Sequence, residues 1–405
     1  MPQIYHLLLT GLWEISNPNA YVKPGRYGNL KIAESKWFIG LFSSKDLKDF
    51  NNINIPISHQ GVERNLSISI SNSTCPFDAS HFLFQFALNS SITPSCPLSI
   101  EHSWYNFSTA LYNKIEGNTN SNYEIFGYFV TPFSQEIEPK PFDYPKNMII
   151  GHRGYGMKQK DYPENTMKSY LAAVRDGADG VEIDLRYSKD KILFSKHYQT
   201  LDSKEIIGKS IVTLFKLHNL RLDDLNSEEI KQNTLIPTFQ QILTELPEDA
   251  IIDAEMKVNT DYFSISDYVD DCLKTILKYN PKRKLFFCSF DFDAIISLAL
   301  KQQRYPAFFL VFPNSPDSFL NGTVFEFLTD ILAATGAGGF IAHSLNALSY
   351  PDLITNVNAK GLHYFTWGIH NIYEWSLYEQ KFLGIKGFIV DNISLAYNVI
   401  KKDDF

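Results

Sequence analysis

Acidic side chains recur at fixed spacing in short apolar segments of the second half of the sequence. Glu182 and Asp184 lie two residues apart in one such segment, so in a strand both side chains point to the same side. Neighbouring carboxylates repel each other and are costly to desolvate unless a cation lies between them. Glu255, in the next such segment, adds a third carboxylate, and all-oxygen ligands favour Mg²⁺ or Ca²⁺ over zinc. The alternative is an ion pair between one of these acids and an arginine such as Arg186.

The elements that carry these residues are predicted by the alternation of apolar and helical segments from residue 146 onward. Near-continuous apolar runs, typical of parallel strands buried on both faces, occupy residues 148–150, 180–185, 250–255, 285–289, 307–311, 339–342, 363–367 and 387–390. Helical patterns lie between them, for example over 164–175 and 238–246. Eight such units predict an α/β fold, a TIM (β/α)₈ barrel, whose typical size is about 250 residues. Because the carboxyl ends of barrel strands meet at one rim, polar residues at those ends become neighbours.

Residues 1–135 differ in composition and favour an all-β sandwich domain ahead of the barrel. Short alternating runs at 66–70 and 82–86 are typical of strands. Trp13, Trp37 and Trp104 suggest a carbohydrate-binding module of the starch-binding type. Core packing of these rings is the alternative, and a lipid-binding sandwich is also open. Residues 136–146 contain three prolines and predict a stiff linker, and the barrel domain extends over 147–405.

Bulk properties exclude some classes of partner. The 405 residues contain 37 Lys and Arg against 45 Asp and Glu, a formal net charge of −8, so no basic surplus favours nucleic acid. No run reaches about 18 apolar residues, so no transmembrane helix is expected. The first residues also lack the basic region and cleavage site of a signal peptide. Four widely spaced cysteines predict reduced thiols in a cytoplasmic protein, with a Cys75–Cys96 disulfide as the alternative.

An ordered series of motifs runs through the second half of the sequence. The series is Gly151-His152-Arg153-Gly154-Tyr155-Gly156, Pro163-Glu164-Asn165-Thr166, residues 177–184, Ser188-Lys189-Asp190, His197, Ile236-Pro237-Thr238-Phe239, Glu255-Met256-Lys257, Ser289-Phe290-Asp291, Trp367 and Gly387-Phe388-Ile389-Val390-Asp391. In this order, the motifs resemble the glycerophosphodiester phosphodiesterase family. The resemblance covers residues 147–398, and the run 152–157 is similar to the eukaryotic branch that cleaves glycerophosphocholine.

The resemblance implies a metal-dependent hydrolase that converts a small glycerophosphodiester, such as glycerophosphocholine, to sn-glycerol 3-phosphate and an alcohol. It implies these site residues: a catalytic pair, His152 and His197; one divalent cation, Mg²⁺ or Ca²⁺, on Glu182, Asp184 and Glu255; phosphate ligands Arg153 and Lys257; and Trp367 on the alcohol side. Phosphodiester cleavage needs one group that activates the attacking oxygen and another that protonates the leaving alcohol. Histidine does either near neutral pH. We assign His152 as base or nucleophile and His197 as acid.

One departure from the family's pattern concerns the residue after the second histidine. The family usually places an aspartate there, and this sequence has Tyr198. A catalytically impaired protein that binds phosphodiester or carbohydrate without turnover is therefore one alternative. The other is a lysophospholipase D-type lipid hydrolase, which requires an apolar groove for an acyl chain. The segment 198–234 lies where a loop that covers the substrate would be.

Some polar residues near the motifs have structural interpretations. Glu164 and Asn165 lie where a helix begins, so we expect them to cap it and to support the site. His218 and His343 are expected to be structural.

Overall fold

The computed structural model describes residues 4–12, 29–32, 37–44, 53–59, 62–72, 82–88, 125–157, 160–201, 206–207, 220–258, 264–312 and 323–402. The chain divides into two compact units. The first holds Met1–Glu138, Ala299–Gln303 and Pro316–Gly336, and the second holds Pro139–Leu298, Arg304–Ser315 and Ala337–Phe405. Within the described ranges, no helix combines the length and the apolarity that a membrane span needs.

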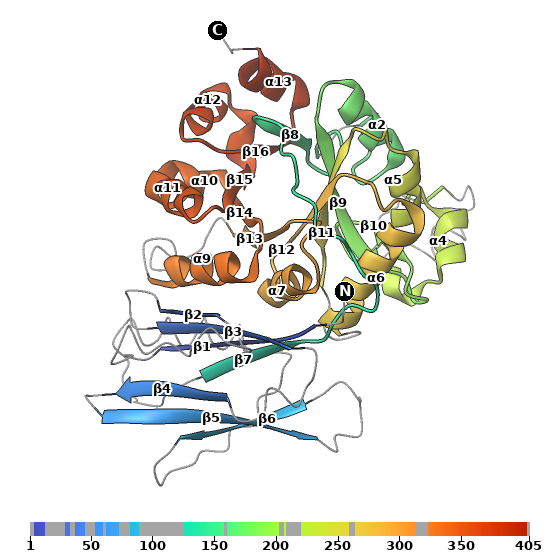
Figure 1. Ribbon diagram of the computed structural model, residues 1–405. Coiled ribbons are helices and arrows are strands. Elements are labelled where there is room, and N and C mark those ends of the chain that lie inside the picture. The colour runs from blue at the N-terminus through green and yellow to red at the C-terminus, as the bar shows by residue number, and fades with distance from the viewer. Residues whose placement is uncertain are drawn as a thin grey trace. The chain divides into compact units, whose positions relative to one another are not determined.

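The described residues before 131 form two antiparallel sheets (Figure 1). One sheet has the order β2 (Asn29–Ile32), β3 (Trp37–Ser44), β1 (Tyr5–Leu12) and β7 (Ile125–Val130), and the other has β4 (Ile53–His59), β5 (Val62–Asn72) and β6 (Phe82–Leu88). The alternating runs 66–70 and 82–86 are strands, as predicted. The packing of the two sheets into a sandwich stays a prediction. Trp13, Trp104, Cys75, Cys96 and His218 lie outside the described residues, and the Trp37 side chain is not described. The carbohydrate or lipid ligand therefore stays a prediction.

Eight parallel strands close into a barrel in the second unit (Figure 1). In ring order they are β8 (Met148–Gly151), β9 (Gly180–Tyr187), β11 (Ile251–Met256), β12 (Leu285–Ser289), β13 (Ala307–Val311), β14 (Gly339–His343), β15 (His363–Trp367) and β16 (Gly387–Val390). The ring is closed because β8 pairs with both β16 and β9. All eight apolar runs predicted as strands form strands of the barrel, which confirms the prediction. Their near-continuous apolar character fits strands that are buried on both faces. The short strand β10 (Leu193–Ser195) pairs antiparallel with the end of β9.

The helices of the second unit lie outside its strand ring (Figure 1). They are α2 (Met167–Arg175), α4 (Ser227–Asn233), α5 (Phe239–Glu245), α6 (Ile265–Tyr279), α7 (Phe292–Lys301), α10 (Ser344–Ser349), α11 (Pro351–Ala359), α12 (Glu374–Phe382) and α13 (Ile393–Lys401), with 3-10 turns η2 (Leu222–Asp224) and η3 (Ile369–Ile372). Helix α9 (Thr323–Thr335) is part of the first unit. The helix predicted over 164–175 begins only at Met167, because the Thr166 side chain accepts a hydrogen bond from the Ser169 backbone N–H and caps it. The capping role expected for Glu164 and Asn165 is therefore wrong.

The barrel interior is filled by apolar side chains. Ten buried residues from the strands form one cluster: Met148, Ile150, Ile251, Phe286, Cys288, Phe308, Leu310, Ile341, Phe365 and Ile389. This cluster makes the barrel interior a packed apolar core and not a channel. Polar chemistry is therefore confined to the carboxyl ends of the strands. Cys272 and Cys288 are buried free thiols, as expected for these two residues.

The proline-containing linker closes the amino-terminal end of the barrel. Phe142 packs edge-on against Phe286, with ring centroids 6.1 Å apart. Tyr144 contacts Phe308 and Phe365 in the same edge-on manner, at 6.3 and 5.9 Å. Since these partners belong to the interior cluster, the two linker rings extend the core beyond the strands. The segment predicted as a spacer is thus also a structural part of the barrel.

The segment 198–234 has a small core of its own in its described part. Phe194 and Leu201 pack with Leu222, Leu225 and Ile230, all of which are buried. This cluster anchors η2 and α4 beside β10. The role of the segment as a cover for the substrate stays a prediction.

The linker rings should contribute measurably to the stability of the barrel. Phe142→Ala is expected to lower the free energy of unfolding by about 2 kcal/mol, less than the roughly 3–5 kcal/mol of a fully buried phenylalanine because this ring is only half-buried. Urea unfolding followed by tryptophan fluorescence measures the change. The matched control is Phe382→Ala on α12, whose side chain is 74% exposed. Equal effects of the two substitutions would contradict the role of the linker as a barrel floor.

Candidate active site

Three acidic side chains meet at the carboxyl ends of neighbouring strands. Glu182 and Asp184 lie on β9, and Glu255 lies on β11 directly opposite Asp184 in the strand register. One carboxylate oxygen from each lies within 4.8 Å of the others. All three residues are buried, with exposed fractions of 3%, 0% and 8%. The alternation along β9 therefore brings together the acids whose spacing predicted a shared site.

Burial and mutual repulsion set the protonation of these acids. Burial, with the charges of Asp184 and Glu255 beside it, raises the pKa of Glu182 well above its usual range. Burial also raises the pKa of Glu255, although Lys257 opposes the shift. Burial alone would raise the pKa of Asp184, but the positive charges of Lys257, His197 and Arg153 and the Asn165 hydrogen bond together outweigh it, and the pKa falls below its usual range. In the absence of a cation, the cluster is thus electrostatically strained.

Asp184 is the best-compensated member of the group. Lys257 Nζ lies 3.0 Å from its Oδ1 and also contacts Glu255 Oε1. Arg153 Nε lies 3.7 Å from Oδ2, which also accepts a hydrogen bond of 2.7 Å from the Asn165 amide. Arg186, the arginine considered as an alternative partner, instead donates to the backbone oxygens of residues 196 and 197.

Glu182 supplies the observation that tests the cluster as a metal site. Its Oε2 accepts a hydrogen bond of 2.7 Å from the Arg153 backbone N–H, whereas its buried Oε1 has no hydrogen-bond partner among the described residues. A buried carboxylate oxygen without a partner is costly unless a cation binds it. Three carboxylates around one point are the donor set that a hard divalent cation prefers, so the residues fit the predicted ion.

His152 is held by an aspartate from the far end of the chain. It follows β8, and its Nδ1 lies 2.9 Å from Oδ1 of Asp391, which follows β16. Burial would raise the pKa of Asp391, but the hydrogen bond from His152 lowers it, so the carboxylate is ionised and Nδ1 is the donor. The same oxygen accepts from the Met157 backbone N–H. Gly156, at φ 95°, permits this approach, since a Cβ there would lie 2.3 Å from the Asp391 backbone oxygen.

His197 occupies the same charged environment but has no such support. It follows β10, and its buried Nδ1 has no hydrogen-bond partner in the part of the chain that the structure describes. Burial lowers the pKa of His197 to about 3, against the attraction of Asp184 and with the repulsion of Lys257, Arg153 and His152. Tyr198 stacks edge-on against its ring at 4.4 Å and is 62% exposed. The tyrosine thus contacts the histidine but does not replace an orienting aspartate.

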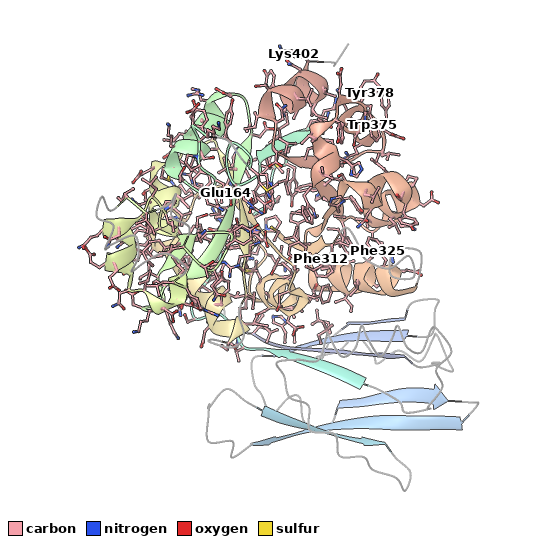
Figure 2. The ribbon with its side chains drawn as sticks, turned by 180° about the vertical axis from the view of Figure 1, so that it is seen from behind. Glu164, Phe312, Phe325, Trp375, Tyr378 and Lys402 are labelled. Carbon is pink, nitrogen blue, oxygen red and sulfur yellow. The ribbon has the colours of Figure 1, made fainter. Side chains whose placement is uncertain are left out.

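Arg153 links the two halves of this arrangement. Its backbone takes φ 52°, an uncommon conformation for a residue with a side chain, and this turn aims its N–H at Glu182. Its guanidinium donates to Glu164 Oε1 at 3.1 Å. Figure 2 labels Glu164 in the region of the barrel mouth. Glu164 and Asn165 therefore support the site as expected, although they do not cap α2.

Aromatic side chains follow β12, β13 and β15, on the part of the rim that begins next to β11. Trp367 ends β15, and its indole N–H donates to the Val311 backbone oxygen at 3.3 Å. Phe290, after β12, contacts Trp367 edge-on at 5.8 Å and stacks on Phe312, after β13, at 4.1 Å. Phe312, labelled in Figure 2, is 58% exposed. We call Phe290, Phe312 and Trp367 the aromatic wall. Of the three, the sequence analysis gave a site role to Trp367 alone: Phe290 lies in a motif without an assigned role, and Phe312 belongs to no motif.

His343, expected to be structural, caps a helix. It ends β14, and its Nδ1 accepts a hydrogen bond from the Leu345 backbone N–H at the start of α10. Its ring also contacts Trp367 edge-on at 5.2 Å. The side chain therefore fixes the start of α10 and packs against one residue of the aromatic wall.

The closed parallel barrel carries buried acids, two histidines and the cationic side chains of Arg153 and Lys257 at its carboxyl rim. This combination is that of a TIM-barrel enzyme. The model of the glycerophosphoryl diester phosphodiesterase family matches residues 152–395. The chain therefore belongs to this family of phosphodiesterases, which confirms the resemblance read from its motifs.

Individual relatives show the same similarity. The glycerophosphocholine phosphodiesterase of Mus musculus is 28% identical over 313 residues, covering 64% of this chain and 45% of the relative. A chloroplastic glycerophosphodiester phosphodiesterase of Arabidopsis thaliana is 22% identical, covering 64% of this chain and 81% of the relative. The chain thus spans less than half the length of the mouse relative.

Solved structures share the fold of the barrel unit. A glycerophosphodiester phosphodiesterase from Parabacteroides distasonis has a TM-score of 0.50 at 17% identity, covering 64% of this chain and 99% of that chain. A protein from Silicibacter pomeroyi has a TM-score of 0.53 at 16% identity, covering 64% and 95%. At these identities the likeness concerns the fold alone, and it supports the TIM barrel.

Removal of one acid should weaken cation binding. A ligand that binds only the folded state raises the melting temperature, so Mg²⁺ or Ca²⁺ should stabilise the unmodified protein. Glu182→Gln is expected to reduce cation affinity at least about tenfold, because it removes the charge and one oxygen of a carboxylate whose Oε1 has no hydrogen-bond partner among the described residues. The control is Glu245→Gln on α5, an exposed position away from the rim. A cation-dependent shift of equal size in both variants, or none in the unmodified protein, would contradict the metal site.

Proposed function

We propose that this chain hydrolyses small glycerophosphodiesters to sn-glycerol 3-phosphate and an alcohol. The observation that carries the proposal is the buried carboxylate oxygen of Glu182, without a partner among the described residues, next to the His152–Asp391 pair. A cluster of acids that is strained without a cation has no evident structural purpose, since apolar residues would pack such a rim at lower cost. Because the chain belongs to a phosphodiesterase family, phosphodiester hydrolysis is the reaction that a cation bound by these acids would assist.

The two histidines provide the proton transfers of this reaction. The Asp391 carboxylate holds the Nδ1–H of His152, so Nε2 is the nitrogen left to take a proton. In the hydrolysis, water adds its oxygen to phosphorus as His152 accepts the proton, the phosphorus–oxygen bond to the alcohol breaks, and His197 protonates the alcohol. Burial lowers the pKa of His197, so its ring is neutral near pH 7 in the free protein; the negative charge of a bound phosphodiester would raise that pKa, as an acid at this position requires. Such acid and base groups each contribute about 10²–10⁴-fold.

One divalent cation would be held by Glu182, Asp184 and Glu255. Such an ion supplies electrostatic stabilisation of the charge that develops on the phosphoryl oxygens. Lys257 already contacts Asp184 and Glu255 and is poised beside the same point. Arg153 and Lys257 add positive charge at the rim, where phosphate oxygens would otherwise repel the acids.

The head-group we propose is choline. In the ring order, the acids lie on β9 and β11, whereas the aromatic wall follows β12, β13 and β15. A phosphodiester bound at the acids would extend one substituent toward the wall. Aromatic faces attract quaternary ammonium groups by about 0.5–2 kcal/mol. The mouse relative named for glycerophosphocholine agrees with this choice.

For the N-terminal region, we infer a β-sandwich domain over 1–135, joined by the linker 136–146 to a barrel domain over 147–405. The two antiparallel sheets before residue 131 support the first domain, and the change of compact unit after Glu138 supports a boundary within the linker.

Turnover of glycerophosphocholine tests the proposal directly. The purified chain should release choline with Mg²⁺ or Ca²⁺ and lose activity in a chelator. His152→Ala should lower kcat by about 10²–10⁴-fold with an unchanged melting temperature, because the side chain acts in proton transfer. His363→Ala is the control, since this ring contacts Tyr144 at the other end of the barrel. No turnover in any metal would sink the proposal, and faster turnover of lysophosphatidylcholine would favour the lipid hydrolase instead.

Head-group selectivity tests the aromatic wall separately. Trp367→Leu is expected to raise KM for glycerophosphocholine by about 3- to 30-fold, the equivalent of a lost cation–π contact. KM for glycerophosphoglycerol, which carries no positive charge on its head-group, should change much less. Trp375→Leu on α12, an exposed tryptophan labelled in Figure 2, is the matched control. An equal rise for both substrates would show that the wall does not recognise choline.

A further inference from the structure

A group of buried polar side chains lies on the Oδ2 side of Asp184. It consists of Asn165, in the loop before α2, Tyr170 on α2, and Ser195 at the end of β10. Their exposed fractions are 4%, 0% and 0%. Tyr170 and Ser195 lie outside the sequence motifs and belong neither to the acids nor to the catalytic pair. We call these three residues the polar cluster.

Hydrogen bonds join all three members of the polar cluster. The Asn165 side-chain oxygen accepts from the Tyr170 hydroxyl and from the Ser195 hydroxyl, each at 2.9 Å. The two hydroxyl oxygens are 2.6 Å apart, and either can donate to the other. Burial raises the pKa of Tyr170 well above its usual range, so its hydroxyl keeps its proton and can donate. The Asn165 oxygen thus faces two hydroxyl groups, which matches its two lone pairs.

The polar cluster holds Asp184 at two points. The Asn165 amide nitrogen donates to Asp184 Oδ2 at 2.7 Å. The Ser195 hydroxyl oxygen accepts from the Asp184 backbone N–H at 3.2 Å. One contact therefore fixes the carboxylate, and the other fixes the backbone that carries it. Tyr170 contacts both of the residues that make them.

The direction of the Asn165 amide follows from these contacts. A flipped amide would turn its carbonyl oxygen toward the Asp184 carboxylate and would take the acceptor away from the two hydroxyl protons. With Oδ2 committed to Asn165, the other oxygen of Asp184 lies 3.0 Å from Lys257 Nζ. The same Nζ contacts Glu255 Oε1, so Oδ1 lies on the side of the other acids. The polar cluster thus determines which oxygen Asp184 presents to a cation.

We propose that Tyr170 is a positioning residue of the cation site. Its hydroxyl fixes the Asn165 amide and the Ser195 hydroxyl, and through them it fixes the orientation of Asp184. Groups that orient a metal ligand typically contribute about 10–100-fold to metal affinity. Tyr170 acts one contact further out, so its hydroxyl contributes less. This inference rests on the cation site that the proposed function requires.

Tyr170→Phe removes the hydroxyl and keeps the buried ring. Calorimetric titration of the full chain with Mg²⁺, and separately with Ca²⁺, should show an affinity lowered about 3- to 10-fold, the effect of one lost hydrogen bond.

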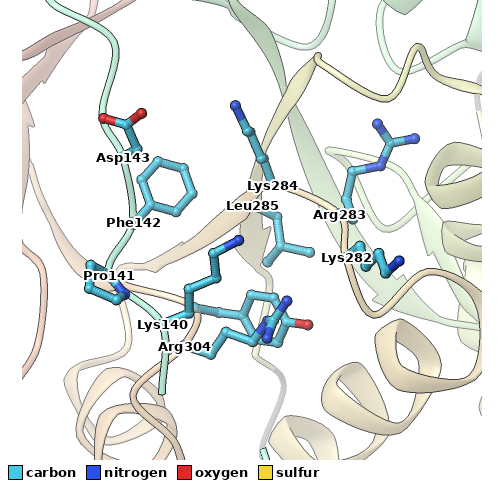
Figure 3. A pocket seen from close by; sticks show the side chains of 10 residues that line it. Lys140, Pro141, Phe142, Asp143, Lys282, Arg283, Lys284, Leu285 and Arg304 are labelled. Carbon is cyan, nitrogen blue, oxygen red and sulfur yellow. The ribbon is translucent and has the colours of Figure 1, made fainter. Parts of the chain in front are cut away.

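The matched control is Tyr305→Phe. Tyr305 is 3% exposed, and its hydroxyl donates to the Pro281 backbone oxygen at 3.0 Å. It precedes β13 at the amino-terminal end of the barrel, where it lines a pocket with Lys140 and Arg304 (Figure 3). This substitution also removes a buried tyrosine hydroxyl, but it should leave cation affinity unchanged. Melting temperatures of both variants verify that they are folded.

A second comparison tests whether Tyr170 acts through Asn165. Asn165→Gly removes the amide, and glycine adopts the observed φ of 56° without strain. In this background, Tyr170→Phe should change cation affinity by less than about twofold, because the group that it positions is gone. A general structural effect of the hydroxyl would instead weaken binding equally in both backgrounds.

The outcomes separate the role of Tyr170 from the metal site itself. Weaker binding in Tyr170→Phe, unchanged binding in Tyr305→Phe and no further loss in the Asn165→Gly background support the proposal. If the unmodified protein binds the cation, then unchanged affinity in Tyr170→Phe, equal weakening in Tyr305→Phe or equal weakening in both backgrounds overturns the role of Tyr170 alone. If the unmodified protein binds neither cation, the metal site and the role of Tyr170 are overturned together.

Discussion

Repulsion between buried carboxylates is the constraint around which the catalytic rim is organised. The register of β9 and β11 brings Glu182, Asp184 and Glu255 together, with one carboxylate oxygen of each within 4.8 Å of the others. Every neighbouring feature moderates this cost: the two cations, the Asn165 amide and the positive φ that aims the Arg153 N–H. The Arg153 turn in turn joins His152 to the acids. The repulsion among these three acids thus accounts for the positive φ of Arg153 as well as for their suitability as cation ligands.

The barrel was predictable from sequence because its strands are buried on both faces, a condition that produces long apolar runs. The pairing of Glu182 with Asp184 was predictable because residues two positions apart on a strand always point to the same side. Contacts between distant residues were not. Asp391 was visible in a motif, but its hydrogen bond to His152 spans 239 residues and depends on barrel closure. Phe312 belongs to no local pattern, because its contact with Phe290 joins two segments that meet only in the folded chain.

The two histidines differ in a way that bears on the missing aspartate. His152 is oriented by a carboxylate, whereas His197 stands beside Tyr198 with its Nδ1 unpaired among the described residues. The departure from the family's pattern therefore falls on the histidine whose Nδ1 has no hydrogen-bond partner in the described chain, and not on the one that Asp391 orients.

The linker rings have a consequence for how the two halves of the chain are dissected. Phe142 and Tyr144 precede the first barrel strand, yet they cover Phe286, Phe308 and Phe365. A fragment trimmed to begin at Met148 would expose this cluster of phenylalanines to water and invite self-association. The functional boundary of the catalytic half thus lies upstream of its secondary structure, and expression of that half alone succeeds or fails on a few residues that look like spacer.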